Sequence, residues 1–329
     1  MQKRFMKVMT LCWGMAMVNM AWASDVMPLI DLEKELQKTQ ENAAHKPAAT
    51  QQAAQTNQIK QASQKPQPKS APSKTTAKKH SVKKAHWRYE GLEGPAHWGD
   101  LDPKFIVCKI GRNQSPINLM NKKAVSTVGL PGFDVYYREV PLRLINNGHT
   151  LQVNYPPGSY IMMNGNRYDL LQFHFHTPSE HQKNGLNYPM EMHLVHQDGE
   201  GHLAVIGILF QEGETHDGLA DIIRYLPKDV GKQRLHKFVK INPVDYFPKS
   251  KLFYKYSGSL TTPPCSEGVY WMVFKEPIEA SPEQLAAMHA LMGDNNRPVQ
   301  PVYSRSILKS WNDTRPLGQA VFPVGGYYQ

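Results

Sequence analysis

The stretch from Gln172 to His176 constrains the fold of this chain more than any other part of the sequence. Aromatic and polar residues alternate along it without a Gly or a Pro, and this pattern predicts a β-strand. Because side chains two residues apart share one face of a strand, His174 and His176 project together. Phe173 and Phe175 point to the opposite face, where they fit a core. The stretch therefore predicts a sheet with one apolar side and a pair of imidazoles on the other.

A second apolar stretch, from Met190 to His196, is expected to form another strand. If the two strands pair, His193 meets His174 and His176 at one point. Three neutral imidazoles with a fourth, open position are the arrangement of a catalytic zinc site. The sequence therefore predicts Zn²⁺ as the cofactor, with these three histidines as its ligands.

Two polar residues lie beside the predicted ligands on the same strand faces. Gln172 and Glu191 each precede a ligand histidine by two residues, where an acceptor would orient an imidazole. The alternative is that the histidines are separate structural side chains of the core or the surface. Two unpartnered imidazoles buried side by side would be costly, so the metal site is the favoured interpretation.

Residues 1–23 have the pattern of a secretory signal peptide. Positive charges at Lys3, Arg4 and Lys7 precede an apolar stretch from Val8 to Trp22, and the small residues around Ala23 form a cleavage site. A retained membrane anchor is the alternative, but the apolar stretch is short for a membrane span. The chain is therefore expected to be exported, to the periplasm or the cell envelope.

Export also bears on the three cysteines of the sequence. Cys12 lies in the signal peptide and is lost with it, which leaves Cys108 and Cys265. An even pair in an oxidising compartment indicates one disulfide, and two free, buried thiols are the alternative.

The region between the signal peptide and residue 86 differs from the rest of the chain. Residues 24–42 are expected to form a short amphipathic helix, with a frayed terminus as the alternative. Residues 43–85 contain nine lysines, no acidic residue and few large apolar ones, which is typical of a disordered basic linker. The linker is interpreted as a solvated spacer, and weak binding of anionic envelope polymers is the alternative function.

Residues 86–329 are expected to form one domain. Short apolar runs recur between turn signals such as Asn147-Gly148 and Asp198-Gly199, whereas helical patterns are confined to about 217–226 and 281–292. The expected fold class is mainly β, with a large central, mostly antiparallel twisted sheet and short peripheral helices.

Several motifs occur in order around the three histidines, namely Gln114–Asn118, Asn146–His149, Ser179–His181, Ser259–Pro264 and Asn296–Pro301. Together they closely resemble the α-class carbonic anhydrases of the exported bacterial type, over nearly all of the chain from His86 to about Leu308. Exported bacterial members join the positions of Cys108 and Cys265 by a disulfide.

The resemblance implies a reaction as well as a fold. It is the reversible, zinc-dependent hydration of CO₂ to bicarbonate and a proton, through attack by a zinc-activated hydroxide. In this family pattern the Thr261 hydroxyl accepts the proton of the hydroxide and donates onward to the Glu180 carboxylate. His149 takes the place of the proton shuttle, since an imidazole titrates near neutral pH. Tyr89, Asn147 and Gln152 would hold the intervening waters, and Gln152 departs from the Asn common at its position.

CO₂ is apolar and needs an apolar wall beside the metal. Val195 shares the strand face of His193 and fits such a wall on the pattern alone. The resemblance adds Val205, Leu260, Val269 and Trp271 to the wall and places Thr262 at the bicarbonate. It also implies inhibition by sulfonamide-type compounds and anions. His181 and His196 are interpreted as structural, with His181 near Glu191.

Two other functions are weighed against the enzyme. One is a non-catalytic binding module on the same fold, tethered to the envelope by the basic linker, and the other is a zinc esterase. The presence of all three zinc histidines with His149, Thr261 and Glu180 favours the carbonic anhydrase. The sequence indicates no specific nucleic-acid partner and is compatible with an oligomer.

Overall fold

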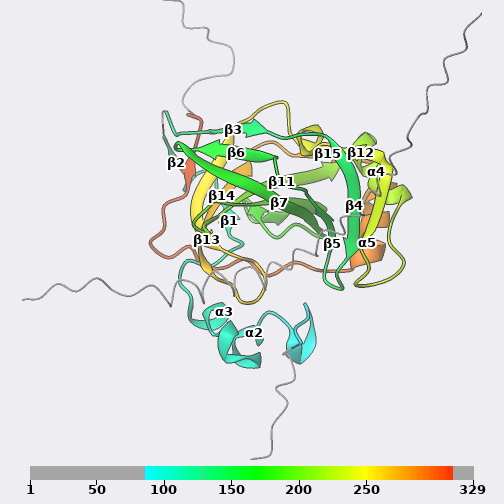
Figure 1. The fold of residues 1–329 in the computed structure, drawn as a ribbon. Coiled ribbons are helices and arrows are strands. Elements are labelled where there is room, and N and C mark those ends of the chain that lie inside the picture. Colours follow the sequence, from blue (N-terminus) through cyan, green and yellow to red (C-terminus); the bar gives the residue numbers. More distant parts are fainter. Residues whose placement is uncertain (1–85, 128, 314–329) are drawn as a thin grey trace, which may run out of the picture.

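A mixed sheet of 13 strands carries the part of the chain that the structure describes (Figure 1). This structure is a computed structural model that describes residues 86–127 and 129–313. The predictions for residues 1–23, 24–42 and 43–85, and the end of the domain beyond residue 313, lie outside the described residues.

The main path of the sheet runs β12-β4-β5-β7-β10-β11-β14-β13-β16-β2, with β15 on β11, β6 on β7 and β3 on β6. Its strands are β2 (Val125–Ser126), β3 (Phe133–Tyr136), β4 (Val140–Asn146), β5 (Leu151–Asn154), β6 (Tyr160–Met163), β7 (Asn166–His176), β10 (Met190–Gln197), β11 (Leu203–Glu212), β12 (Arg234–Ile241), β13 (Phe253–Ser259), β14 (Glu267–Phe274), β15 (Ile278–Ala280) and β16 (Leu308–Lys309). A small second sheet consists of β1 (Asn118–Leu119), β8 (Gln182–Lys183) and β9 (Leu186–Asn187).

Most neighbours in the large sheet are antiparallel, as the short runs and turns predict. The parallel pairs are β11 with β14, β11 with β15, and β16 with β2. The prediction of a mainly β fold with one large sheet and short peripheral helices is confirmed, and the sheet is mixed.

The helices are short and lie around the sheet. They are η1 (Gly91–Glu93), α2 (Trp98–Leu101), η2 (Pro103–Phe105), α3 (Val107–Ile110), α4 (Asp217–Arg224), η3 (Pro243–Tyr246) and α5 (Pro282–Met292). α2 and α3 contact each other and lie below the sheet in the view of Figure 1, and α4 and α5 contact each other. A capping box between Ser281 and Gln284 starts α5, and Gly293 ends it with a φ of 63°.

Two apolar clusters occupy opposite faces of the central strands. Phe173 and Phe175 on β7 pack with Leu194 of β10 in the larger cluster. Val195 and Trp271 belong to the smaller one. Burying a side chain as large as Phe contributes roughly 1.5–3 kcal/mol to the stability of the fold, so the burial of these side chains fixes which face of each strand is turned to which cluster. The sheet therefore lies between the two clusters, and the face of β7 that carries His174 and His176 is opposite the larger cluster.

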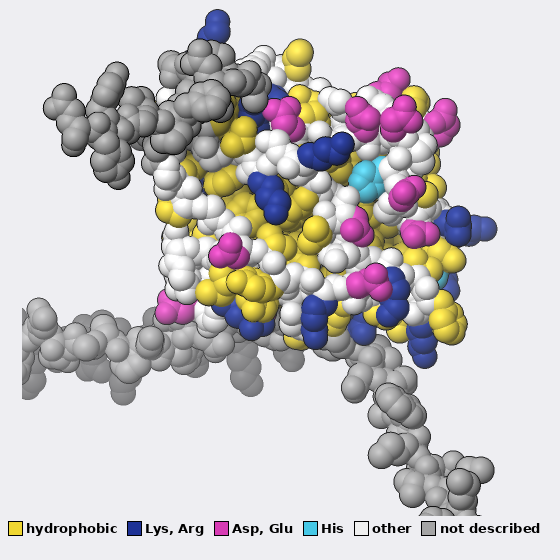
Figure 2. Space-filling view, turned by 90° about the horizontal axis from the view of Figure 1, so that it is seen from above, with side chains coloured by type: hydrophobic (Ala, Val, Ile, Leu, Met, Phe, Trp, Pro, Cys, Tyr) yellow, Lys and Arg dark blue, Asp and Glu magenta, His cyan; other side chains and the backbone are white. Residues whose placement is uncertain are grey.

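The surface seen from above combines apolar and charged side chains. Figure 2 shows an apolar area with Lys, Arg, Asp and Glu side chains around and among it. Charges of both signs border the area, so this face is not a continuous basic surface. None of the helices in the described residues has the length and apolar character needed to cross a membrane.

Candidate metal centre and active site

Antiparallel pairing of β7 and β10 brings three histidines together. His193 lies opposite His174 in the register, and the neighbouring His176 lies opposite Glu191. The ring centroids are 5.0 Å apart for His174 and His176, and 5.3 and 4.7 Å from these two rings to His193. One nitrogen of each ring lies within 4.8 Å of the other two. His176 and His193 are buried, and His174 is half-buried.

Fixed acceptors hold one nitrogen of each ring on β7. His174 Nδ1 donates to Gln172 Oε1 over 2.9 Å, and His176 Nδ1 donates to the Asn295 carbonyl over 2.7 Å. A ring that donates through Nδ1 in its neutral form presents a lone pair at Nε2. Both β7 histidines therefore present Nε2 to the centre of the cluster.

The third ring is held the other way round. His193 Nε2 donates to Glu191 Oε1 over 2.9 Å, which leaves Nδ1 for the centre. Glu191 is fully buried and also accepts from the backbone N–H groups of Glu180 and His181 and from His181 Nδ1. Burial alone would raise the pKa of Glu191, but the His181 and His193 imidazoles hold it well below its usual value. Glu191 is thus a fixed anion behind the ring of His193.

These residues fit a zinc ion. Burial lowers the pKa of His174 well below its usual value, and the neighbouring imidazoles lower it further. Burial likewise lowers the pKa of His176, so His174 and His176 are neutral at pH 7. Among the described residues His176 Nε2 is buried and has no hydrogen-bond partner, and a cation at the centre would supply one. Three imidazole nitrogens aimed at one point are the donor set of catalytic zinc.

A second group of possible ligands, His181, Glu191 and His193, lies alongside. Its atoms are already paired with one another, and His181 Nε2 meets the Tyr256 hydroxyl at 2.7 Å. This group is therefore a hydrogen-bond network that supports the centre and does not form a second one.

The Glu180 carboxylate lies against the cluster. It is fully buried, and Oε1 accepts from the Arg297 backbone N–H over 2.9 Å. Oε2 lies 3.6 Å from His176 Nε2 and 3.9 Å from His193 Nδ1. Because the pKa of His176 is lowered, the 3.6 Å contact is not an ion pair at neutral pH. Oε2 has no hydrogen-bond partner among the described residues, and Thr261 is likewise buried.

The apolar residues expected beside the metal lie together. Val195, Val205 and Trp271 face one another across β10, β11 and β14 in the register. Trp271 lies 4.8 Å from the ring of His193, and its Nε1 donates to the Ser259 carbonyl over 2.9 Å. All the expected wall residues are buried members of the smaller apolar cluster, Val195, Val205, Leu260, Val269 and Trp271. Thr262 follows at a half-buried position.

Known proteins share this architecture and sequence. Residues 93–311 match the model of the eukaryotic-type carbonic anhydrases. A carbonic anhydrase of Nostoc sp. is 44% identical over 231 residues, which is 70% of this chain and 88% of the relative. The chain belongs to the α-class carbonic anhydrase family. The expected enzyme class, carbonic anhydrase or carbonate dehydratase with zinc as cofactor, is confirmed.

Solved structures agree. The α-carbonic anhydrase of Thermovibrio ammonificans, solved with the inhibitor sulfanilamide, is 48% identical and has a TM-score of 0.66 over 68% of this chain and 99% of that chain. Dioscorin, solved with ascorbate, has a TM-score of 0.64 at 31% identity over 68% of this chain and 98% of that chain. An α-carbonic anhydrase and dioscorin thus share this fold, so the function has to be argued from the individual residues of the site.

The residue expected as proton shuttle in this carbonic anhydrase lies on a turn between β4 and β5. Asn147 Oδ1 accepts from the backbone N–H groups of His149 and Thr150, at 3.0 and 2.9 Å. The half-buried His149 ring stacks on Trp87 with a centroid distance of 3.7 Å and an interplanar angle of 8°. Tyr89 packs edge-on against Trp87 at 5.5 Å. Burial, and after it the Glu180 carboxylate, raises the pKa of Tyr89 well above its usual value, so its hydroxyl stays protonated.

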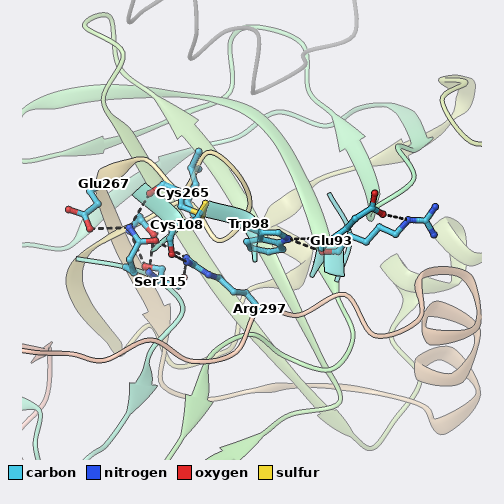
Figure 3. Close-up of a disulfide and its surroundings, with 11 residues drawn as sticks. Glu93, Trp98, Cys108, Ser115, Cys265, Glu267 and Arg297 are labelled. Atoms are coloured by element: carbon cyan, nitrogen blue, oxygen red, sulfur yellow. Dashed lines mark hydrogen bonds and ion pairs between the residues drawn. A yellow bond between two sulfur atoms is a disulfide. The ribbon is translucent and has the colours of Figure 1, made fainter. Parts of the chain in front are cut away.

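The disulfide between Cys108 and Cys265 is confirmed, and free thiols at these positions are excluded (Figure 3). Both sulfurs lie in a small cluster with Trp87, Trp98 and Phe105. The bond ties α3 to the loop before β14, the loop that carries Thr261 and Thr262.

Arg297 is a buried residue whose contacts no local sequence pattern indicates. Its guanidinium donates to the Cys108 and Ser115 carbonyls (Figure 3) and to Gln114 Oε1. Its backbone N–H donates to Glu180 Oε1. Burial lowers its pKa to about 10, so it stays charged at neutral pH. The Asn296–Pro301 motif contains it, but only the fold shows what it contacts.

His181 and His196 are structural, as expected. His181 is bonded within the Glu191 network. His196 meets the Tyr137 hydroxyl at 2.6 Å and the Ala204 carbonyl at 3.1 Å, and burial lowers its pKa to about 4. His196 is three positions from His193, so strand alternation places its ring on the opposite face of β10.

Proposed function

We propose that this chain is an exported zinc carbonic anhydrase that interconverts CO₂ and bicarbonate, with Glu180, Thr261 and His149 in distinct roles. One observation carries the proposal. Three imidazoles, each held by its own acceptor, turn their remaining nitrogens to a common point.

The histidine nitrogens of the metal centre are His174 Nε2, His176 Nε2 and His193 Nδ1. When bound there, zinc supplies the Lewis acidity that makes water a nucleophile near neutral pH, for which carbonic anhydrase is itself the standard illustration. Gln172, Asn295 and Glu191 fix the three rings in the tautomer that leaves these nitrogens free. The chain thus sets the donor atoms before a ligand arrives.

Glu180 and Thr261 orient the attacking oxygen. Glu180 is fixed through Oε1 by the Arg297 N–H, and its buried Oε2 remains to accept a hydrogen bond. We assign that bond to the Thr261 hydroxyl, which then accepts from the nucleophile and turns a lone pair towards the carbon of CO₂. The support for this role is the unpartnered Oε2 beside the histidines together with the family pattern.

The apolar wall gives CO₂ a place next to the nucleophile. Val195, Val205 and Trp271 offer no hydrogen bond to water on this side, and Leu260 and Val269 complete the surface. Thr262 supplies a hydroxyl for the bicarbonate that forms. A linear apolar substrate is thereby favoured over water at the point of attack.

His149 carries the released proton to solution. Its turn lies at the surface end of β5, whereas Gln152 on β5 lies opposite His174 in the register. An imidazole gains and loses a proton near neutral pH. Near this turn, Asn147 donates a hydrogen bond to Gln152, and the raised pKa of Tyr89 keeps its hydroxyl protonated. We propose that they order the waters between the metal centre and His149.

We also infer export to the periplasm or cell envelope. The disulfide fits an oxidising compartment, and the N-terminal sequence has the pattern of a signal peptide. Sulfonamides and small anions are expected inhibitors, by analogy with the Thermovibrio ammonificans structure for the sulfonamides. The basic linker is proposed to act mainly as a spacer, with weak attraction to polyanions.

The test compares two substrates in matched samples. Full-length mature protein is stripped of metal, reloaded with zinc, and assayed for CO₂ hydration and for hydrolysis of a small activated ester. A carbonic anhydrase regains hydration with one zinc per chain and hydrolyses the ester far more slowly. Efficient ester hydrolysis without hydration would establish the esterase, and zinc binding without either activity would establish the binding module.

A further inference from the structure

Four side-chain amides form a continuous hydrogen-bonded row beside the proposed proton path. Asn154 Nδ2 donates to Gln233 Oε1 over 2.6 Å, and Gln152 Nε2 donates to Asn154 Oδ1 over 2.6 Å. Asn147 Nδ2 donates to Gln152 Oε1 over 3.3 Å. Every N–H in this amide row points towards Gln233 and every oxygen towards Asn147. Aligned amides polarise one another, so the row acts as a unit.

The Asn147 end of the row holds the turn of the proposed shuttle. Asn147 Oδ1 accepts from the backbone N–H groups of both His149 and Thr150. The Gln233 end lies in the loop before β12. The amide row therefore links that loop to the backbone of His149 through side chains alone.

A second contact joins the same loop to the same turn. The Gly231 N–H donates to the Asn146 carbonyl over 2.8 Å, and Val230 forms an isolated bridge with Asn146. Asn146 Oδ1 in turn accepts from the Gly148 N–H over 2.9 Å. Two independent sets of bonds thus brace the turn from the β12 side, while Trp87 stacks on the His149 ring.

Burial makes the middle of the row rigid. Gln152 and Asn154 are 9% and 5% exposed, so neither can exchange its partners for water at little cost. Gln152 spans from Asn147 to Asn154, and an Asn in its place has one methylene fewer with which to do so. The departure from Asn at position 152 therefore has a structural consequence in this chain, since it connects the turn to Gln233.

We propose that Gln233 is a positioning residue for proton transfer, which holds the His149 turn through the amide row Gln233–Asn154–Gln152–Asn147. The inference rests on the proposed shuttle role of His149. In the described part of the chain, the Gln233 side chain is hydrogen-bonded to Asn154 and not to a metal ligand. We therefore expect Gln233 to act on the shuttle and to leave the interconversion of CO₂ and bicarbonate at the metal unchanged. Transfer through water depends steeply on the position of the accepting ring, so a displaced turn slows it.

The test uses variants that separate size from hydrogen bonding. Gln233→Leu and Gln233→Ala remove the acceptor for Asn154 Nδ2, whereas Gln233→Glu keeps an acceptor oxygen. Lys232→Ala is the matched control in the same loop, because Lys232 is exposed and its ion pair with Asp229, at 3.8 Å, lies outside the amide row. All are made in the full mature chain, and zinc content is measured for each.

Two readouts are compared. Without zinc, hydrogen exchange of the His149 and Thr150 amides should speed up in the Leu and Ala variants and stay slow in Gln233→Glu and Lys232→Ala. With zinc, turnover in dilute buffer should fall by about 3- to 10-fold in the Leu and Ala variants, within the ~100-fold that a 1 Å displacement can cost. Isotope exchange between CO₂ and bicarbonate should remain within about twofold of the parent for every Gln233 variant, since the metal centre is untouched.

A double variant separates this inference from the shuttle role itself. If Gln233 acts through His149, His149→Ala with Gln233→Leu should be no slower than His149→Ala alone. A further loss in the double variant, or unchanged amide exchange in Gln233→Leu, would overturn the role of Gln233 while leaving the shuttle standing. A His149→Ala variant with full turnover in dilute buffer would overturn the shuttle, and the role of Gln233 with it.

Discussion

Single nitrogen atoms decide what the cluster of His174, His176 and His193 can bind. Each ring could present either nitrogen, and the hydrogen bonds to Gln172, Asn295 and Glu191 choose which. Two rings present Nε2 and one presents Nδ1. Losing any of these three hydrogen bonds would let the ring rotate. The acceptors are therefore expected to matter for zinc affinity nearly as much as the ligands.

Two substitutions separate the attack on CO₂ from the export of the proton. His149→Ala should lower turnover at saturating CO₂, because the proton then leaves slowly, while CO₂–bicarbonate isotope exchange stays near the parent rate. A small imidazole buffer should restore much of the loss. Thr261→Ala should slow the exchange itself, by about 10²-fold if a transition-state hydrogen bond is lost, and no buffer should repair it. An unrescued exchange defect in His149→Ala would remove His149 from the shuttle role.

The pH dependence of stability should show the buried, neutral ring of His196. An unfolded His protonates as the pH falls through 6.5, whereas the folded pKa is about 4. Folding is therefore penalised progressively between pH 6.5 and 4, by about 3 kcal/mol in total, and no further below that. The free energy of unfolding of the zinc-free protein, measured in urea, should fall less from pH 7 to pH 4.5 in His196→Gln than in the parent. Equal losses in both proteins would mean that His196 does not carry this penalty.

At the scale of elements, the pairing of β7 with β10 brings the three histidines together. The segment after α5 provides the acceptor for one of them, His176. The chain after α5 brings Asn295 to His176 and Arg297 to Glu180. The position of this helix therefore determines where Asn295 meets His176 and where the Arg297 N–H meets Glu180.

The N-cap of α5 is a test at this scale. Ser281 Oγ accepts from the Gln284 N–H, and Gln284 Oε1 accepts from the Ser281 N–H. Ser281→Ala should cost about 1 kcal/mol of unfolding free energy in denaturant titrations, and Ser281→Asp should cost much less because it keeps the acceptor. Equal losses for Ala and Asp would show that the cap does not set the stability of this helix.

Local patterns predict the parts of the site that lie within one strand, and miss the parts that meet through the fold. The two-residue period of a strand is enough to place His174 beside Gln172 and His193 beside Glu191. Asn295 could not be found this way, because it meets His176 through a backbone carbonyl that any residue type possesses. Trp87 was likewise not predicted as the partner of His149, since stacking between residues 62 positions apart leaves no mark in either local pattern.

At the scale of the whole molecule, the chain combines a catalytic domain with a basic N-terminal region of different composition. All the proposed site residues lie between residues 86 and 313, the part that the structure describes. The nine lysines of residues 43–85 account for most of the net charge of +10. Catalysis and any attraction to polyanions should therefore be separable.

Truncation tests this separation. A chain that starts at His86 should fold with its disulfide and keep CO₂ hydration near that of the mature protein, because no predicted catalytic residue precedes Tyr89. Binding to an immobilised polyanion should drop with the nine lysines, and in the mature protein it should weaken as salt rises. A large loss of turnover in the folded, zinc-loaded truncation would show that the N-terminal region takes part in catalysis.

The central claim is that His174 Nε2, His176 Nε2 and His193 Nδ1 hold a zinc ion. X-ray absorption at the zinc edge of the purified mature protein tests it most directly, with His174→Ala, His176→Ala and His193→Ala measured alongside for metal content. The expected result is one zinc per chain with three imidazole nitrogens at about 2.0–2.1 Å and one oxygen ligand, and loss of the metal in each variant. A sulfur or carboxylate-rich ligand shell, or a variant that keeps its zinc with full affinity, would contradict the assignment.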